Sequence, residues 1–157
     1  MFWAGIVDDK LVGPVRVPQG VKIDSESYCN LLEEALFPWF EKLSSARKKD
    51  IIFMHDNAPS HSSRYTKEYM KNRGLKEDQI MVWPPNSADL NPIENLWSII
   101  KQDVYKDGKQ YSSKENLWKA ILEAAKGVPA STIKRLTASM DSRLLDIHKK
   151  NGGHINK

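Results

Sequence analysis

Two short apolar segments open the chain, at residues 2–7 and 11–17, and a polar turn of Asp8, Asp9 and Lys10 separates them. Short segments rich in β-branched and aromatic residues, bounded by turn residues, predict β-strands. Two such strands joined by so short a turn predict an N-terminal β-hairpin.

The next apolar positions recur with the spacing of a helix. After Gly20, Asp24 can cap a helix that carries Tyr28 and Leu32 on its apolar face. Pro38 should kink or restart this helix, because proline cannot donate a backbone hydrogen bond and its ring clashes with the preceding turn. We therefore expect one broken helix in this region.

Residues 51–54 form a short apolar run without alternation, which favours a strand that is buried on both faces of a sheet covered by helices. Residues 57–61 then turn the chain into a helix that begins at about Ser62. Gly74 stands where a left-handed residue commonly ends a helix. Strand, turn and helix follow one another in this part of the chain.

A second apolar run at residues 80–83 is halted by two prolines at 84–85, and the loop at 86–90 leads to a helix that begins at Asn91-Pro92. This repeat of strand and helix predicts the α/β class.

The rest of the sequence predicts helices alone. We expect them at residues 92–104, 112–125 and 131–148. Ser112 and Glu115 have the spacing of a capping box at the start of the second of these helices. The C-terminal part of the chain is therefore predicted to be helical.

Length and composition fit one domain with a single core, since the chain has 157 residues of which 40% are hydrophobic. The apolar runs are far shorter than a bilayer span and the first residues lack a signal peptide, so we expect a soluble, intracellular protein without a membrane segment. A single cysteine, Cys29, excludes an internal disulfide and gives no indication of zinc or redox chemistry.

The net charge of +4 permits contact with a polyanion such as nucleic acid. The basic residues are spread along the chain, however, and a solvated surface explains such a spread equally well. Charge alone therefore does not assign a function.

Asp56 stands at the carboxyl end of the predicted buried strand, where α/β proteins gather their reactive groups. It is well placed to bind a metal ion, and it is equally well placed to accept backbone N–H groups in the following turn. His61 lies near the start of a helix, where a packed or capping role is more common than a metal-ligand role.

Glu94 has two interpretations as well. It follows the helix cap Asn91 by three residues, as in a capping box, and it could instead bind a metal ion. Asp89, in the loop before this helix, is interpreted as a turn residue.

Two segments together resemble a known pair of signatures. Residues 55–61 (His-Asp-Asn-Ala-Pro-Ser-His) and residues 83–97 (Trp-Pro-Pro-Asn-Ser-Ala-Asp-Leu-Asn-Pro-Ile-Glu-Asn-Leu-Trp) resemble the paired signatures of the mariner and Tc-like transposases. We call them the first and the second signature. The resemblance extends to the C-terminal end of the chain, where Arg143-Leu144 and residues 152–154 are similar to the terminal helix and tail of the family.

The resemblance implies a ribonuclease-H-like core, in which a mixed sheet is flanked by helices. It also implies that Asp56 is the second catalytic aspartate and that Glu94 is the final acidic residue. In this family, three carboxylates share a pair of Mg²⁺ or Mn²⁺ ions that promote cleavage of DNA and strand transfer. Asp56 would bridge both ions, and Glu94 would complete the coordination of one.

Two departures from the family pattern stand out. Ala88 replaces a proline that is common in the second signature. The first catalytic aspartate of the family lies on a strand that precedes the hairpin, whereas this chain begins with the hairpin. We therefore expect a single catalytic domain, residues 1–157, that is truncated at its N-terminal side. Asp8 and Asp9 are poor substitutes for the missing carboxylate, because both fall in the predicted hairpin turn.

The resemblance implies a catalytic core fragment of a cut-and-paste DNA transposase, with DNA as transposon ends and target, and a nuclear location. With two of three carboxylates, we expect weak metal binding and slow or absent cleavage by the chain alone. The alternative is a non-catalytic transposase remnant that acts as a DNA-binding or oligomerisation module. Exposed strand edges would favour a homodimer. An unrelated α/β domain, in which Asp56 and Glu94 only cap and turn, is the third interpretation.

Overall fold

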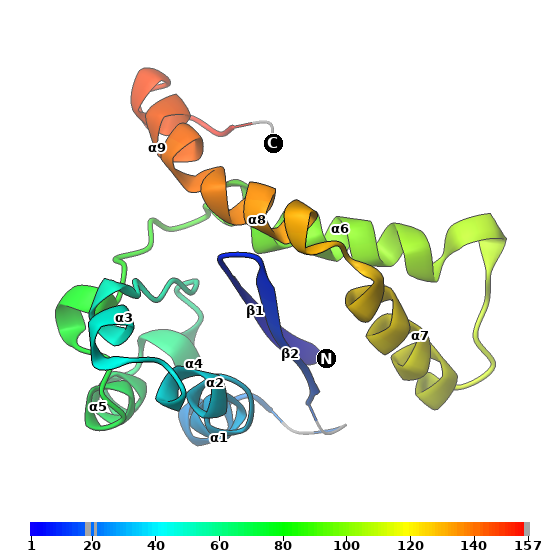
Figure 1. Ribbon diagram of the computed structural model, residues 1–157, viewed down its shortest axis with the longest axis horizontal. Helices are drawn as coiled ribbons and strands as arrows, with labels where there is room; N and C mark the ends of the chain where they lie inside the picture. The colour runs from blue at the N-terminus through cyan, green and yellow to red at the C-terminus, as the bar shows by residue number, and fades with distance from the viewer. Residues whose placement is uncertain (18–19, 21, 156–157) are drawn as a thin grey trace. The chain divides into compact units, whose positions relative to one another are not determined.

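The computed structural model describes residues 1–17, 20 and 22–155 (Figure 1). Contacts between Cα atoms divide it into two compact units. Unit 1 comprises Met1–Ala4 and Val15–Ser87, and unit 2 comprises Gly5–Pro14 and the chain from Ala88 onward.

The predicted N-terminal hairpin is confirmed. Strand β1 (Phe2–Val7) pairs with strand β2 (Lys10–Arg16) in a two-stranded sheet, drawn in blue in Figure 1. The turn consists of Asp8 and Asp9, and Asp8 has a φ of 52°, which aspartate tolerates better than most residues. The two aspartates are therefore turn residues, as the sequence predicted.

Unit 1 is built mainly from helices. They are α1 (Ser25–Ala35), α2 (Phe37–Glu41), α3 (Ser45–Asp50), α4 (Pro59–Ser62), α5 (Arg64–Asn72) and the short 3₁₀ helix η1 (Glu77–Gln79). The predicted cap of α1 is confirmed, because Asp24 accepts the N–H of Ser27 at 2.9 Å. The helix breaks before Pro38, as expected, and α2 restarts it at Phe37.

The core of unit 1 lies between α1, α2 and α5. Helix α1 packs against both of the others, and its Tyr28 and Leu32 are 1% and 0% exposed. Phe37 and Phe40 of α2 and Met70 of α5 complete the centre of this core. The apolar helix faces predicted from the sequence therefore meet one another.

The two predicted inner strands are the main difference from the sequence-based expectation. Residues 51–54 and 80–83 are extended, but they pair only through a parallel bridge between Phe53 and Ile80. The N–H of Phe53 donates to the carbonyl of Gln79 at 2.7 Å, and the carbonyl of Phe53 accepts the N–H of Met81 at 2.9 Å. Among the described residues the only sheet is the hairpin, so the predicted mixed sheet is not formed there.

The physical reason is that an apolar run predicts burial, whereas a strand also requires a partner along its whole length. The prediction that residues 51–54 are buried on both faces is wrong for Ile52, which is 54% exposed. In the second apolar run, Val82 is 94% exposed. The parallel direction of the single bridge agrees with the predicted α/β order of elements.

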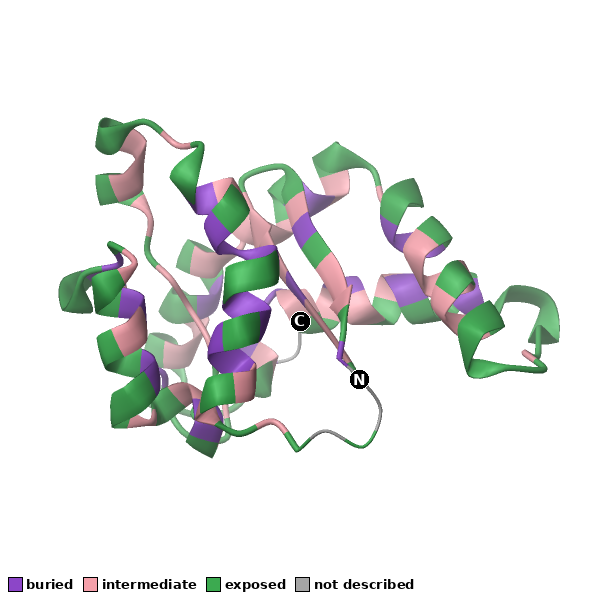
Figure 2. Cartoon of the chain, turned by 90° about the horizontal axis from the view of Figure 1, so that it is seen from below, coloured by how far each residue is buried: buried purple, intermediate pink, exposed green. Residues whose placement is uncertain are grey.

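Unit 2 contains η2 (Ala88–Leu90), α6 (Ile93–Val104), η3 (Lys106–Gly108), α7 (Lys114–Gly127), α8 (Ala130–Ala138) and α9 (Met140–Lys149). Helix α6 packs against α7 and α8. Leu96, Ile100 and Val104 of α6 are buried between these helices, and Ile6 and Leu11 of the hairpin pack against the same cluster. Figure 2 shows buried and exposed positions alternating around the helices.

Two helix boundaries differ from the prediction. Helix α7 is capped by Ser113 rather than by Ser112, because the Ser113 hydroxyl accepts the N–H of Asn116 at 3.1 Å. The single helix predicted at 131–148 is divided at Ser139 into α8 and α9. The Ser139 hydroxyl donates to the carbonyl of Leu136 at 2.6 Å, and such a bond competes with the helical pattern.

The predicted absence of a membrane-spanning segment can be compared with the helices. In the part of the chain that the structure describes, no helix has the length and apolar character needed to cross a membrane.

Candidate metal-binding and catalytic residues

Asp56 follows the bridged segment around Phe53 and precedes helix α4. Its carboxylate oxygen Oδ1 accepts the N–H of Ala58 at 3.0 Å, which closes the turn that leads into Pro59. The side chain is 63% exposed. The turn interpretation of Asp56 is thus confirmed, and this role still leaves the carboxylate accessible to another ligand.

His61 contacts the same oxygen of Asp56. The ring Nδ1–H donates to Oδ1 across 2.6 Å, so both hydrogen bonds from Ala58 and His61 converge on one oxygen. The His61 side chain is only 19% exposed, and its ring packs on the buried ring of Tyr28 with centroids 3.9 Å apart. His61 is therefore a packed residue, as the sequence predicted, and it also orients the carboxylate of Asp56.

His55 completes an aromatic cluster around this carboxylate. Its ring lies parallel to that of His61, with centroids 5.3 Å apart, and its Nδ1 accepts the hydroxyl of Tyr28 at 3.1 Å. Burial is the largest cause that lowers the pKa of His55, to about 4, and the charge of His61 acts in the same direction. Burial also raises the pKa of the Tyr28 hydroxyl. His55 is consequently neutral at physiological pH.

Sequence reasoning missed this cluster of Tyr28, His55 and His61. The two histidines belong to the first signature, but Tyr28 comes from α1, and no spacing in the sequence links it to them. The pairing depends on how α1 packs against α4.

Asn57 ties the first signature to the beginning of the second. Its amide Nδ2 donates to the carbonyl of Trp83 at 2.6 Å. A cavity of about 340 Å³ opens beside this contact, and its lining includes His55, Asn57 and Trp83. Lys67 and Lys71, one turn apart on α5, also line it. This cavity lies wholly within unit 1 and combines apolar walls with two cationic side chains.

Glu94 is an exposed residue in the first turn of helix α6 in unit 2. The helix start is fixed by Asn91, whose Oδ1 accepts the N–H of Ile93 at 3.2 Å and whose carbonyl accepts the N–H of Glu94 at 3.2 Å. The cap position is Pro92 rather than the expected Asn91, which precedes it and engages the first turn of the helix through these two bonds. A carboxylate in this turn is stabilised by the positive end of the helix dipole.

Asp89 does more than turn the chain. Its Oδ2 accepts the N–H of Ile155 at 2.7 Å and contacts Nδ1 of His154 at 3.2 Å, while its carbonyl accepts Nη1 of Arg143 at 2.8 Å. The hydrogen bond from Ile155 is the largest cause that lowers the pKa of the Asp89 carboxyl. Asp89 thus joins the second signature to α9 and to the C-terminal tail.

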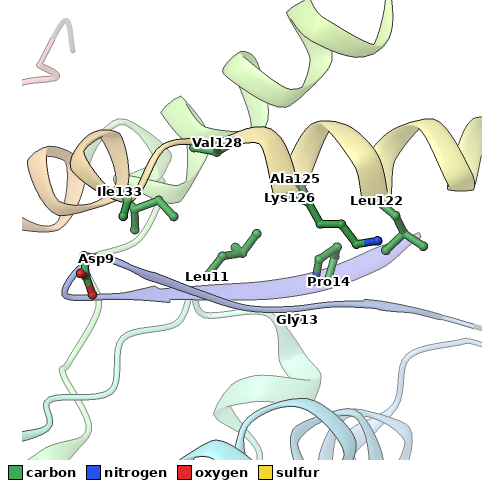
Figure 3. A pocket seen from close by; sticks show the side chains of 10 residues that line it. Asp9, Leu11, Gly13, Pro14, Leu122, Ala125, Lys126, Val128 and Ile133 are labelled. Atoms are coloured by element: carbon green, nitrogen blue, oxygen red, sulfur yellow. The ribbon is translucent and has the colours of Figure 1, made fainter.

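The hairpin turn carries the other two aspartates that could act as ligands. The carbonyl of Asp8 accepts the hydroxyl of Thr137 at 2.6 Å. Asp9 lines a cavity of about 300 Å³ within unit 2, and Figure 3 shows Leu11 and Ile133 among its apolar walls. Among the residues that the structure describes, neither aspartate belongs to a group of three or more histidine, cysteine, aspartate or glutamate side chains that could hold a metal ion.

The donor atoms of Asp56 and Glu94 fit a hard divalent cation, since both residues present carboxylate oxygens on exposed side chains. Asp56 lies in unit 1 and Glu94 in unit 2, and each belongs to its own local network. Within residues 1–17, 20 and 22–155, no group of three or more histidine, cysteine, aspartate or glutamate side chains is arranged to hold a metal ion. The assignment of these two residues as metal ligands stays a prediction.

The sequence is similar to those of known transposases and to a family model that includes both candidate residues. The family model described as DDE superfamily endonuclease matches residues 27–118, which is more than half of the chain and includes both Asp56 and Glu94. The Tc3 transposase of Caenorhabditis elegans is 40% identical over 156 residues, covering 99% of this chain and 45% of that protein. The Tc1 transposase of the same organism is 30% identical over 152 residues, covering 97% of this chain and 52% of that protein. The chain spans about half the length of these curated relatives.

Solved structures add evidence on the fold. The catalytic domain of the Mos1 mariner transposase superimposes with a TM-score of 0.74 at 19% sequence identity, and the match covers 94% of this chain and 69% of that chain. The likeness supports the ribonuclease-H-like fold class, whereas the predicted central sheet is not confirmed in detail. By the family-model match and the two signatures together, the chain belongs to the DDE superfamily endonucleases, as a member of their mariner and Tc-like transposase branch.

Proposed function

We propose that this chain is the catalytic core of a cut-and-paste DNA transposase, which cleaves DNA and transfers the cut strand to a target. The observation that carries the proposal is the family-model match to residues 27–118, because this range contains both signatures and both candidate carboxylates. The similarity to the Tc3 transposase, which is 40% identical over 99% of this chain, supports the same activity.

Asp56 and Glu94 bind the catalytic metal in this proposal. Mg²⁺ or Mn²⁺ suits their oxygen donors, and the Mos1 catalytic domain, to which this chain is similar in fold, has been solved with each of these ions. When bound, such an ion activates the attacking oxygen and offsets the negative charge that develops on the scissile phosphate. The residues of this chain hold and orient the ligands. His61 and Ala58 engage Oδ1 of Asp56, so Oδ2 is the oxygen available to the metal.

DNA is the substrate, and the cavity beside the first signature supplies cationic contacts for its phosphates. Lys67 and Lys71 line this cavity next to His55 and Asn57, which flank Asp56. The logarithm of the DNA-binding constant falls linearly with the logarithm of the salt concentration. Each phosphate contact that is lost should reduce the magnitude of this slope by about 0.9. Replacing both lysines by alanine should therefore reduce the slope by about 2, whereas replacing the exposed Lys42 and Lys49 of the same unit should leave it unchanged.

A homodimer belongs to the same proposal. Ile52 and Val82 are exposed apolar residues on the two extended segments, and strand edges of this kind invite pairing with a second chain. Sedimentation velocity across a range of protein concentrations should detect a dimer. A species that stays monomeric throughout the range would count against this part of the proposal.

A nuclear location follows from a chromosomal DNA substrate. Microscopy of a fluorescent fusion should show enrichment in the nucleus, and a fusion that is excluded from the nucleus contradicts the expectation.

Plasmid nicking tests the proposed activity. Supercoiled DNA is incubated with an excess of protein, so that slow cleavage is visible, in Mg²⁺, Mn²⁺ or EDTA. We expect nicking that requires the divalent ion and that falls to background in Asp56→Asn and in Glu94→Gln. Asp9→Asn is the matched control, because Asp9 is an aspartate of the hairpin turn and should leave the rate unchanged. Nicking that persists in EDTA, or in both carboxylate variants, contradicts the proposal.

A further inference from the structure

Arg143 of helix α9 is a buried arginine whose guanidinium bridges the segments on either side of Glu94. The residue is 3% exposed. Its Nη1 donates to the carbonyl of Asp89 in η2 at 2.8 Å, and its Nη2 donates to Oδ1 of Asn95 in the first turn of α6 at 2.6 Å. Its Nε donates to the hydroxyl of Ser139 at 2.9 Å, which anchors the guanidinium to its own helix.

The cost of burying this side chain argues for a specific role. A buried cation is destabilising unless its donors are satisfied, and these acceptors of Arg143 are uncharged oxygens. Burial accordingly lowers the pKa of Arg143, although the charge of the Asp89 carboxylate opposes this shift. The planar guanidinium presents its donors in a fixed fork, so it holds its acceptors at a defined separation. The single ammonium group of a lysine could not do this.

The C-terminal tail reinforces this bridge through Asp89. The carboxylate of Asp89 accepts the N–H of Ile155, a residue that is 4% exposed, while the carbonyl of the same Asp89 is held by Arg143. Helix α9 also packs against η2. The loop before α6 is therefore held from two directions, by the guanidinium and by the tail.

We propose that Arg143 is a positioning residue for Glu94. It fixes the first turn of α6 through Asn95 and the preceding loop through Asp89, and thereby holds the Glu94 carboxylate in the orientation that binds the metal. This inference rests on the proposed function, in which Glu94 is a metal ligand.

Metal affinity separates positioning from a purely structural role. Mn²⁺ binding to the whole chain is measured by calorimetry, and urea unfolding gives the stability of each variant. Arg143→Met should weaken Mn²⁺ binding by about tenfold to a hundredfold, the range typical of residues that orient metal ligands. Arg143→Lys should lose part of the affinity, because one ammonium cannot hold both acceptors. Asn95→Ala leaves the guanidinium in place and removes only its contact with α6, so it provides the test if Arg143→Met does not fold.

Ile100→Ala is the matched control, because Ile100 is buried on the same helix but two turns beyond Glu94. It should lower stability while leaving Mn²⁺ affinity within about twofold under conditions where the protein is folded. Arg143→Met should also have no further effect on affinity in a Glu94→Gln background, because the ligand that it positions is then absent.

The outcomes distinguish the metal role of Glu94 from the positioning role of Arg143. If Glu94→Gln leaves Mn²⁺ affinity unchanged, the proposed metal role of Glu94 fails. If Glu94→Gln weakens binding but the folded Arg143→Met or Asn95→Ala protein binds Mn²⁺ as tightly as the wild type, the positioning role of Arg143 is overturned and the metal role stands.

Discussion

His61 donates its Nδ1–H to Oδ1 of Asp56 over 2.6 Å, in a contact whose geometry is set by the packing of the histidine ring on Tyr28. Tyr28 is 1% exposed, so the histidine rests on a rigid part of the core of unit 1. A carboxylate that is held in this way needs little reorganisation to bind a cation. The exposed Asp56 is therefore oriented in advance by a residue that does not itself have to contact the metal.

Removing the His61 side chain should weaken metal binding without removing a ligand. We expect His61→Ala to lower Mn²⁺ affinity by about tenfold, because the Asp56 carboxylate then samples other rotamers. His61→Asn retains a hydrogen-bond donor and should keep more of the affinity than alanine does. Calorimetric titration measures the Mn²⁺ affinity of both variants. An unchanged affinity in His61→Ala would show that the hydrogen bond from His61 does not orient Asp56.

The contact between Asn57 and Trp83 should contribute to the stability of unit 1. In Asn57→Ala the carbonyl of Trp83 loses the donor that lies 2.6 Å away, and the free energy of unfolding should fall by about 1–3 kcal/mol. Urea unfolding gives this value. The exposed Asn72 of α5 serves as the control, and its replacement by alanine should change stability by less than about 0.5 kcal/mol. Equal effects of the two substitutions would argue against this role of Asn57.

Ile100 tests the core of unit 2. The residue is 3% exposed among the residues of α6 and α7, so Ile100→Ala should cost about 2–5 kcal/mol of unfolding free energy through lost burial and a residual cavity. Leu145 of α9 is 58% exposed, and Leu145→Ala should change stability by less than about 0.5 kcal/mol. Denaturant unfolding compares the two, and similar losses would mean that Ile100 is not a core residue.

Asp89 should make stability depend on pH in the acid range. Its folded-state pKa lies below the ordinary value of 3.8, chiefly because Ile155 donates to the carboxylate, with His154 as a further cause. The stabilisation is therefore present above pH 3.8 and is lost as pH falls through the lower folded-state pKa. The charged groups that face this carboxylate are Arg143 and His154.

Urea unfolding between about pH 5 and about pH 2 measures this effect. The wild type should lose more stability on acidification than Asp89→Asn, which cannot ionise at this position. Parallel acid profiles for the two proteins would show that the tail contact does not depend on the charge of Asp89.

Local features of the fold were predictable because short-range physics determines them. Asp24 caps α1 through the N–H of a residue three positions ahead, and Gly74 adopts a φ of +91° after α5. The hairpin likewise follows from a turn that only two aspartates span. Each of these structures depends on neighbouring residues, which the sequence displays directly.

Long-range pairings were not predictable from the sequence pattern. The strands expected at 51–54 and 80–83 share only one bridge, because pairing depends on the position of a partner rather than on apolar character. Arg143 bonds to Asp89 and Asn95, far away in sequence, and nothing in a helical pattern indicates that an arginine will be buried. The candidate ligands Asp56 and Glu94 were found through their signatures, whereas the residues that orient them emerged only from the packing.

The most direct test of the account is a double-mutant cycle on Mn²⁺ affinity, with Asp56→Asn, Glu94→Gln and the double variant measured by calorimetry. If the two carboxylates hold the same metal site, each single substitution should weaken binding by at least about tenfold, and the double variant should bind much more tightly than the product of the two losses predicts. Losses that multiply independently, or single variants that bind Mn²⁺ as the wild type does, would contradict the claim that Asp56 and Glu94 act together on one divalent ion.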